Sequence, residues 1–401
     1  MIDITNKKLC CGCSACVQAC PKKCLSLVED EMGFLYPTVS KEECIECGLC
    51  EKVCPELNKW EANSPLHIYA CKNKNHEQRN NSSSGGLFVL LAEQVIKRNG
   101  VVFGAKFDSD WSVIHSYAEN LVDLSSFQGS KYVQSRVENS FSLCKGFLEQ
   151  GRPVLFSGTP CQISGLKHYL RKDYEELLTV EIICHGVPSP RVWRDYLDNI
   201  RNSERKGNIK GRDMSSQTVV PLIEHVSFRD KHNGWNNYCF NVRFAANHLH
   251  TNKEICESHE DNLFMKGFLN NLYLRPICFN CPAKENRSKA DMSLGDFWSI
   301  NKHCAKFNDD KGTTLTYINS DKGFAAFKSI DCDCIQLEKD IVYNKAYFES
   351  TREKYSISQF ASEYENNGIA SVIEALKTIR EPFIKRSLSK VRKIIANYIR
   401  K

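Results

Sequence analysis

One cysteine spacing occurs twice within the first 60 residues, and it constrains this region more than any other feature of the sequence. The spacing is C-x2-C-x2-C-x3-C-P, which holds [4Fe-4S] clusters. Three thiolates from one tight turn reach three corners of a cubane, while the fourth cysteine starts a helix that carries it to the neighbouring cluster. The first copy comprises Cys10, Cys13, Cys16, Cys20 and Pro21, and the second comprises Cys44, Cys47, Cys50, Cys54 and Pro55.

Each copy is expected to lend its last cysteine to the other cluster. We therefore assign Cys10, Cys13, Cys16 and Cys54 to one [4Fe-4S] cluster, and Cys44, Cys47, Cys50 and Cys20 to the other. Zinc is the alternative, but it prefers two C-x2-C pairs and has no use for a third cysteine two residues on. Cys11 and Cys24 fall outside the spacing and are expected to be packing or incidental thiols. Over about its first 60 residues the sequence resembles a bacterial dicluster ferredoxin.

Composition supports metal or redox chemistry in a reducing compartment. Cysteine accounts for 21 of 401 residues, too many for an ordinary cytosolic enzyme and too few for a disulfide-knotted mini-protein. The sequence begins without an apolar segment of signal-peptide length and contains no long uncharged apolar run, so we expect a cytoplasmic protein.

The positive charge is concentrated near the end of the sequence. Residues 374–401 carry a net charge of +7, which leaves −1 for the rest of a chain whose total is +6. This distribution argues against a nucleic-acid-binding body. Apolar positions at helical spacing predict a basic amphipathic helix over residues 383–399. Such a helix can pack on its own domain, contact an anionic membrane surface as a peripheral segment, or dock on an acidic partner.

After the cysteine-rich region, strand-like and helical segments alternate. Strands are predicted at 68–70, 101–107, 113–117, 153–156 and 177–183, helices at 87–97, 138–149, from 160 and at 190–200, and a β-hairpin at 219–228 and 238–246. The predicted class is α+β/α/β, a small dicluster ferredoxin domain followed by an α/β body and a C-terminal basic helix. We expect domains at 1–60, 65–150 and 151–340, with a helical tail at 341–401.

Two groups of residues in the body are candidate sites. The loop Ser82–Gly86 precedes the helix at 87–97, where it is either a phosphate cradle or a serine-capped helix start. Cys161 and Cys184 follow two predicted strands, and Cys278 and Cys281 form a C-x2-C pair. Because strand ends converge at one edge of an α/β sheet, these four thiols could hold a third [4Fe-4S] cluster. Buried structural cysteines or half of a zinc site are the alternatives.

Six segments in a fixed order resemble the coenzyme F420 hydrogenase/dehydrogenase beta-subunit family over about residues 65–340. They are Asn81–Gly86, Gly129–Ser135, Phe156–Gln162, Cys184–Pro190, Arg275–Cys281 and Ala290–Trp298. The resemblance implies an iron–sulfur flavoprotein with a flavin-binding body, in which FAD exchanges electron pairs with an organic acceptor and single electrons with clusters. It favours the third cluster at Cys161, Cys184, Cys278 and Cys281.

The resemblance also marks candidate flavin contacts. They are Ser83, Ser84, Gly85 and Gly86 of the loop, together with Lys131, Tyr132 and Gln134, which an ordinary strand would equally explain. Asp291 and Asp296 are either pocket groups or caps of the turn at Gly295, with the cap preferred. His185 is expected to be simply hydrogen-bonded.

Three functional hypotheses follow. The first is an enzyme that moves electrons between the clusters, FAD and coenzyme F420 or another organic acceptor, supplied by a ferredoxin or a redox partner protein. The second is a non-catalytic electron-transfer subunit of a partner oxidoreductase. The third is an iron–sulfur protein kept for structure or interaction. The sequence assigns no catalytic residue.

Overall fold

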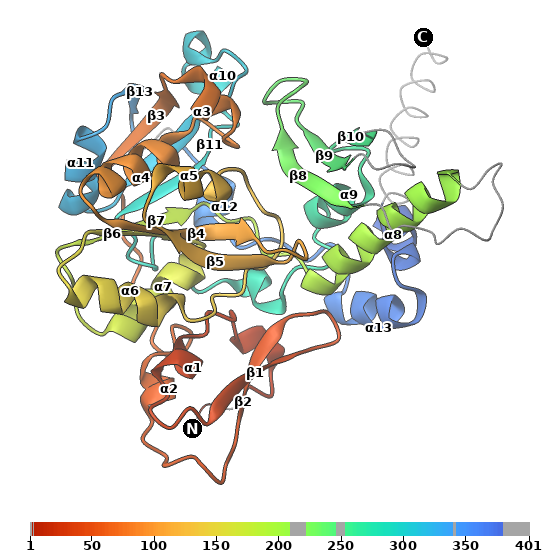
Figure 1. Cartoon of the computed structure of the whole chain (residues 1–401), viewed down its shortest axis with the longest axis horizontal. Helices are drawn as coiled ribbons and strands as arrows, with labels where there is room; N and C mark the ends of the chain where they lie inside the picture. Colours follow the sequence, from red (N-terminus) through yellow and green to blue (C-terminus); the bar gives the residue numbers. More distant parts are fainter. Residues whose placement is uncertain (1, 3, 209–221, 246–252, 340–341, 380–401) are drawn as a thin grey trace, which may run out of the picture.

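The body of the protein is built on one eight-stranded mixed sheet (Figure 1). The structure, a computed structural model, describes residue 2 and residues 4–208, 222–245, 253–339 and 342–379. The strand order is β13-β3-β12-β11-β7-β6-β4-β5. The strands are β3 (His67–Asn73), β4 (Val101–Phe107), β5 (Val113–Ala118), β6 (Val154–Gly158), β7 (Leu177–Ile182), β11 (Met292–Asp296), β12 (Thr314–Ile318) and β13 (Cys332–Leu337).

The four central strands β4, β6, β7 and β11 are parallel, and the strands outside them are antiparallel. Parallel neighbours end at the same edge of a sheet. Gly158, Ile182 and Asp296 therefore terminate three adjacent strands side by side. Thr159 continues directly from β6 as the N-cap of the next helix, with Pro160 at its first position. Cys161, Cys184 and Asp296 therefore lie at this edge or just beyond it.

Helices cover both faces of the sheet. On one face, α4 (Leu87–Lys97) and α11 (Asp321–Lys328) bury apolar side chains against the strands. On the other, α6 (Ser140–Glu149) and α7 (Pro160–Leu170) do the same. Shorter segments are α3 (His76–Asn80), α5 (Leu121–Leu124), α10 (Ile300–His303), α12 (Lys345–Phe348) and the 3-10 turns η1 (Lys7–Leu9), η2 (Ser125–Phe127), η3 (Pro276–Asn280) and η4 (Ala305–Phe307).

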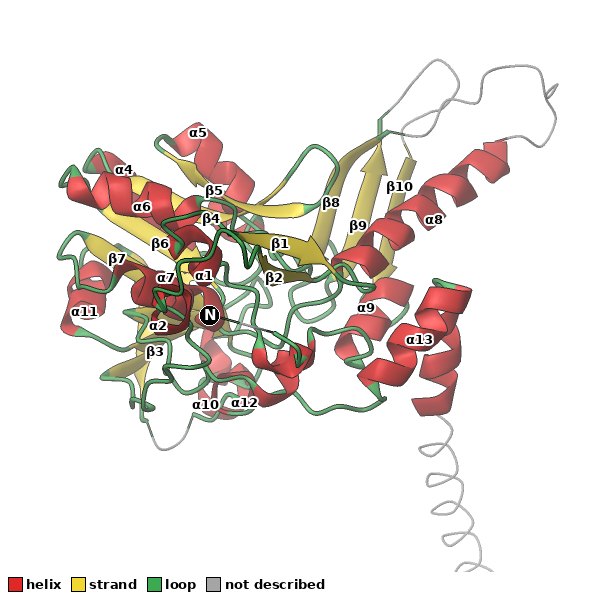
Figure 2. Cartoon of the chain, turned by 90° about the horizontal axis from the view of Figure 1, so that it is seen from below, coloured by secondary structure: helices red, strands yellow, loops and turns green. Residues whose placement is uncertain are grey.

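A second, smaller sheet with its own helices lies beside the large sheet (Figure 2). The strands β8 (Ile223–Asp230), β9 (Cys239–Phe244) and β10 (Lys253–Ser258) form an antiparallel sheet. It shares an aromatic core with α8 (Pro190–Asn208), α9 (Leu263–Leu269) and α13 (Ile357–Asn367). A disulfide joins Cys239 to Cys256, a pairing that the expected reducing environment did not suggest.

The cysteine-rich head comprises α1 (Ala15–Ala19), α2 (Leu49–Lys52) and the hairpin of β1 (Leu25–Glu29) and β2 (Leu35–Val39). It lies beneath α6 and α7 in Figure 1. Head residues including Cys13, Ala15 and Val53 belong to the same apolar core as these two helices. The head therefore packs on the body over a shared apolar contact.

The sequence predicted the body well where hydrophobic periodicity is strong. The helix at 87–97 and the strand at 101–107 have the expected bounds, and the predicted hairpin is β8 and β9. The helix expected at 138–149 begins at Ser140, and the one expected to end at 200 continues to Asn208. The mixed α/β class is confirmed, and the basic helix expected at 383–399 lies outside the described residues.

Among the described helices, none combines the length and the apolar character that a bilayer crossing requires.

Gly165, inside α7, marks how closely the head approaches the body. A Cβ atom built on Gly165 would lie 2.8 Å from the Cβ and 2.9 Å from the Sγ of Cys13. Replacing glycine by alanine inside a helix normally stabilises a protein by about 1 kcal/mol. At this position the new methyl group has to displace the head.

We expect Gly165→Ala to destabilise the protein by about 1–3 kcal/mol, as overpacking does. Gly146→Ala in α6 is the matched control, because nothing lies within 4 Å of a Cβ built there, and it should stabilise. Thermal unfolding of both variants measures the difference. Equal stabilisation by the two substitutions would contradict this packing.

Candidate cluster and cofactor sites

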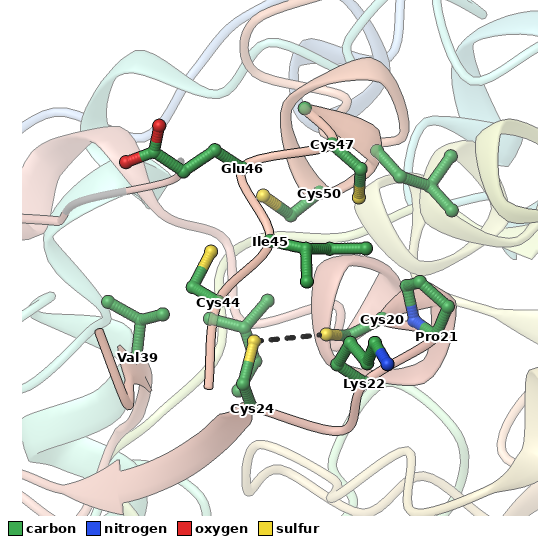
Figure 3. A pocket seen from close by; sticks show the side chains of 13 residues that line it. Cys20, Pro21, Lys22, Cys24, Val39, Cys44, Ile45, Glu46, Cys47 and Cys50 are labelled. Carbon is green, nitrogen blue, oxygen red and sulfur yellow. Dashed lines mark hydrogen bonds between the residues drawn. The ribbon is translucent and has the colours of Figure 1, made fainter. Parts of the chain in front are cut away.

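Three of the four cysteines of the second motif line a small pocket in the head (Figure 3). Cys44 and Cys47 lie on the loop before α2, Cys50 lies in the first turn of α2, and Cys20 reaches the pocket from the end of α1. This is the set that the spacing assigns to one cluster. Gly48 holds the loop in a left-handed turn with φ of 68°, a conformation that favours glycine.

Cys24 also lines this pocket, which its position outside the motif did not predict. Its Sγ lies 3.4 Å from the Sγ of Cys20, and Figure 3 shows the two side chains facing each other. Sequence spacing could not reveal this contact, because Cys24 reaches the pocket through the start of the β1 hairpin.

The first set joins cysteines from both motifs. The pKa of Cys16 is raised to about 12, mainly by burial and further by the neighbouring thiols of Cys10 and Cys54. Cys13 likewise lies near Cys16 and Cys54. Without metal such thiols hold their protons, and iron binding has to displace them. The structure thus brings Cys54 to the first copy of the motif.

Arg275 provides a test of whether this site fits an iron–sulfur cluster. Its side chain is 0% exposed, and it contacts no carboxylate among the described residues. The guanidinium donates to the carbonyl oxygen of Cys10 at 2.7 Å and lies 3.5 Å from the Cys10 Sγ. A buried charge without a counter-charge is strongly destabilising. Thiolates that ligate a cluster beside Cys10 would supply the negative charge, so the residues present fit the group.

Arg275 also ties the head to the body. It donates to the Oε1 of Gln134 at 2.9 Å and to the carbonyl of Leu35 at 2.9 Å, and it lies over the Tyr36 ring. Gln134 in turn donates to the carbonyl of Cys11 at 3.1 Å. Gln134, expected as a flavin contact, is placed at this joint.

The four body cysteines expected to hold a third cluster come together at the edge where the parallel strands end. Cys161 follows β6, Cys184 follows β7, and Cys278 and Cys281 flank the end of η3. Burial raises the pKa of Cys184 to about 12, and Cys161 and Cys281 are close enough to raise it further. Cys278 is affected by the same three neighbours.

In the described chain, no three Cys, His, Asp or Glu side chains are arranged to hold a single metal ion. Four thiolates on one zinc ion lie roughly 3.8 Å apart at zinc–sulfur bonds of about 2.3 Å. A cubane binds each thiolate to a different iron and spreads them further. A zinc site and a cubane therefore require different spacings of the same four thiols.

Cys11 lies between the head and body cysteines. Its thiol is close enough to Cys13 of the first set and to Cys161 of the body for both to shift its pKa, which is raised well above the usual value. The hydrogen bond with Cys11 is the largest influence raising the pKa of the Cys161 thiol, followed by burial. The Oγ1 of Thr159 lies 3.2 Å from the Cys161 Sγ. Cys11, expected to be an incidental thiol, thus lies close to two candidate cluster sites.

A second site centres on Arg229, a residue that the sequence motifs did not single out. Its guanidinium donates to the Oδ2 of Asp296 at 2.7 Å, to the hydroxyl of Tyr132 at 3.1 Å and to the carbonyl of Ser83 at 3.2 Å. It also lies 4.1 Å from the Tyr238 ring centre. Ser83, Tyr132 and Asp296 come from three separate motifs, so Arg229 gathers them at one point.

Arg229 is 5% exposed, yet its Nε has no hydrogen-bond partner within the described protein. A buried donor without an acceptor is costly. An acceptor atom of a bound cofactor would satisfy it, so the residues around Arg229 fit a polar organic group such as a flavin nucleotide.

Other predicted contacts are engaged within the chain. Ser83 Oγ accepts from the Ser130 amide at 2.6 Å, and Ser84 Oγ donates to the Thr313 carbonyl at 2.8 Å. A Cβ on Gly85 would lie 2.3 Å from the Cys71 carbonyl, and Gly86 is the helix N-cap with φ of 80°. The backbone of this loop therefore packs closely against the backbone of β3, so the loop is not an open phosphate cradle.

The ammonium group of Lys131 forms its hydrogen bonds within its own loop. It donates to the carbonyls of Ser126, Gln128 and Gly129, while burial lowers its pKa to about 7.

Asp291 and Asp296 do not cap the turn at Gly295, which was the role preferred from the sequence. Asp291 accepts from the Thr179 hydroxyl at 2.6 Å and from the Ser320 hydroxyl at 2.6 Å, which ties β7 to the start of α11. Asp296 pairs with Arg229 instead of capping a turn. His185 contacts Asn271 at 2.6 Å, the hydrogen-bonded arrangement expected of it.

Comparison with known proteins identifies the family. Residues 151–341 match the C terminus of the coenzyme F420 hydrogenase/dehydrogenase beta subunit, and residues 9–57 match the 4Fe-4S dicluster domain. Residues 151–341 belong to the coenzyme F420 hydrogenase/dehydrogenase beta-subunit family. The chain is an iron–sulfur protein with a dicluster head, related to subunits of oxidoreductases.

Individual relatives cover smaller parts of the chain. The ketoisovalerate oxidoreductase subunit VorC of Methanothermobacter marburgensis is 35% identical over 71 residues, which are 17% of this chain and 85% of VorC. An uncharacterized polyferredoxin-like protein of Methanocaldococcus jannaschii is 28% identical over 69 residues, 15% of this chain and 41% of that protein. A chain of the F420-reducing [NiFe] hydrogenase complex from Methanosarcina barkeri aligns over 80% of this chain and 94% of its own length, with a TM-score of 0.42 and 14% identity.

We expect Arg275→Gln to cost about 3–5 kcal/mol of stability, because it removes the charge that balances a buried anion. Arg194→Gln is the control, since Arg194 joins the head to the body through a partly exposed ion pair with Glu29. Exposed pairs contribute about 0.2–1 kcal/mol. Anaerobic denaturation of the cluster-loaded variants measures both values, and similar losses for the two would refute the role of Arg275.

Proposed function

We propose that the protein is an iron–sulfur flavoprotein oxidoreductase that passes electrons between its [4Fe-4S] clusters and FAD, and on to coenzyme F420 or another organic acceptor. A ferredoxin or another redox protein is the proposed partner of the head. The observation that carries the proposal is the close packing of Cys13 of the head against Gly165 of α7, the helix that carries Cys161, with Cys11 near both cysteines.

The first step of the route leads from the head into the body. Cys13 and Cys161 belong to the first and third candidate cluster sites, and Cys11 is close to both. Arg275 holds the Cys10 loop against the body, and it lies three residues before Cys278 along the chain. Two clusters at these sites would be close neighbours, separated by protein rather than by solvent.

The second step leads from the third site toward Arg229. The His185 ring packs edge-on against Phe268, with centres 5.3 Å apart, and Phe268 lies 4.8 Å from the Tyr132 ring. Tyr132 in turn contacts Arg229 through its hydroxyl. The candidate flavin site is therefore separated from the residue after Cys184 by two aromatic contacts.

The residues around Arg229 have separable roles. Arg229 would bind an acceptor atom of the cofactor through its free Nε, while Asp296 and the Ser83 carbonyl fix the orientation of the guanidinium. Trp298 is 50% exposed and stacks on Trp235 with centres 4.8 Å apart, forming an aromatic surface beside this site. When bound, FAD would supply the conversion between single-electron and hydride chemistry.

A non-catalytic electron-transfer subunit is the second candidate. The observation that favours this candidate is that the hydroxyl groups of Ser83 and Ser84 already form hydrogen bonds within the chain. In that case the clusters would serve a substrate site on a partner protein.

A cofactor inventory of anaerobically purified protein tests the proposal. We expect about 12 iron atoms and one FAD per chain, four irons for each of three clusters. About eight iron atoms without flavin would refute the third cluster and the flavin site together. About 12 iron atoms without flavin would favour the electron-transfer subunit.

Substitution of Arg229 locates the flavin independently. Arg229→Gln should lower the flavin content at least about tenfold, the effect of losing about 1.4 kcal/mol of binding, while the iron content stays unchanged. Arg243→Gln is the control, because Arg243 is exposed on the adjacent strand β9. Unchanged flavin in Arg229→Gln would place the cofactor elsewhere.

A further inference from the structure

Three cysteines outside every cluster motif meet at the outer edge of the large sheet. Cys71 lies on β3, and Cys332 and Cys334 lie on β13, the last strand in the order. Cys71 is 0% exposed, Cys332 is partly buried and Cys334 is exposed. Neither the sequence motifs nor the proposed electron route uses these thiols.

The register of the two strands makes Cys71 and Cys332 diagonal neighbours. Cys71 lies opposite Cys334, and Cys332 lies opposite Asn73, two residues earlier on β13. In antiparallel strands, directly opposite and diagonal residues point to the same face of the sheet. All three thiols therefore share one face, and Cys71 reaches inward toward the core beneath α4.

The two cysteines of the Cys239–Cys256 disulfide are also diagonal neighbours on paired antiparallel strands. Cys239 lies opposite Ser258, and its bonded partner Cys256 stands two residues before Ser258 on the paired strand. Their Cα atoms are 5.9 Å apart, within the range of disulfides. Because strand twist has a fixed hand, the same diagonal in another antiparallel pair brings its cysteines together in the same way.

The side chains of Cys71 and Cys332 point to the same face of the sheet on this diagonal, close enough to influence each other's pKa. A hydrogen bond with Cys71 is the main influence that lowers the pKa of the Cys332 thiol, and a hydrogen bond with Cys334 adds to it. Cys332 is also reachable from solvent, whereas Cys71 is not. A partly exposed thiol with increased thiolate character beside a second thiol is the arrangement of an exchange site.

We propose that Cys332 and Cys71 form a thiol–disulfide exchange site that takes low-molecular-weight disulfides. The Cys332 thiolate attacks one sulfur of the small disulfide, so a mixed disulfide forms and one small thiolate leaves. Cys71 then passes its proton to the small thiolate that has just been released and attacks the Cys332 sulfur, which releases the second small thiolate. Two protein thiols are oxidised to one disulfide, and one small disulfide is reduced to two thiols.

Cys334 is the poorer disulfide partner, both for Cys332 and for Cys71. Cys332 and Cys334 are two residues apart on one extended strand, about 6.6 Å at a rise of 3.3 Å per residue. This separation is at the upper limit for disulfides, and their side chains point the same way instead of toward each other. Cys334 lies directly opposite Cys71, but Cys332 has the larger influence on the pKa of the Cys71 thiol.

Peptide mapping of the whole, cluster-loaded protein tests this assignment. The protein is treated anaerobically with oxidised glutathione, the remaining thiols are alkylated, and disulfide-linked peptides are found by mass spectrometry. We expect a peptide that joins Cys71 to Cys332. Iron content, measured in parallel, checks that the cluster cysteines have not reacted.

Three variants separate the roles of the thiols. Cys332→Ser should abolish the linkage, and Cys71→Ser should stop the reaction at a persistent glutathione adduct on Cys332. Cys334→Ser is the matched control and should leave the linkage intact. If Cys71→Ser does not fold, Cys332→Ser and Cys334→Ser still decide the question. A linkage through Cys334, or an unmodified Cys332 in the wild-type protein, would overturn the proposal.

Discussion

The fold depends on one buried positive charge. Arg275 is fully enclosed, donates to backbone carbonyls of the head and to Gln134 of the body, and lies beside the sulfur of Cys10. A guanidinium in this position is tolerated only when an anion balances it. The charge of the candidate cluster and the docking of the head are therefore parts of the same electrostatic arrangement. The proposed electron route depends on this joint, because it fixes the first candidate cluster site against the body.

The parallel centre of the large sheet organises the remaining chemistry. β6, β7 and β11 are adjacent and end at one edge, where Cys161, Cys184 and Asp296 follow or complete them. Loops that are distant along the chain meet at this edge because each of them begins where its strand ends. The third cysteine set and the Arg229 site are thus neighbours because of strand order, with Phe268 packed between His185 and Tyr132.

Sequence reasoning succeeded where local spacing determines structure. The cysteine motifs and the periodic segments of the body depend on turns, helices and strands that neighbouring residues specify. It failed where tertiary contacts decide the role of a side chain. Arg229 lies in an unremarkable strand, and Gln134 forms hydrogen bonds with Arg275 and with the Cys11 carbonyl of the head. Cys11 and Cys24 were set aside for their spacing, yet both lie close to candidate ligands.

The enclosure of Arg275 also bears on how the protein matures. A newly made chain without iron and sulfide would have to bury this guanidinium beside protonated thiols, at a high cost in free energy. The head is therefore expected to remain undocked until its first cluster has been inserted. Cofactor delivery then acts as a checkpoint on tertiary assembly, and a chain that has missed it exposes the apolar surface around Ala15 and Val53 to the quality-control machinery of the cell.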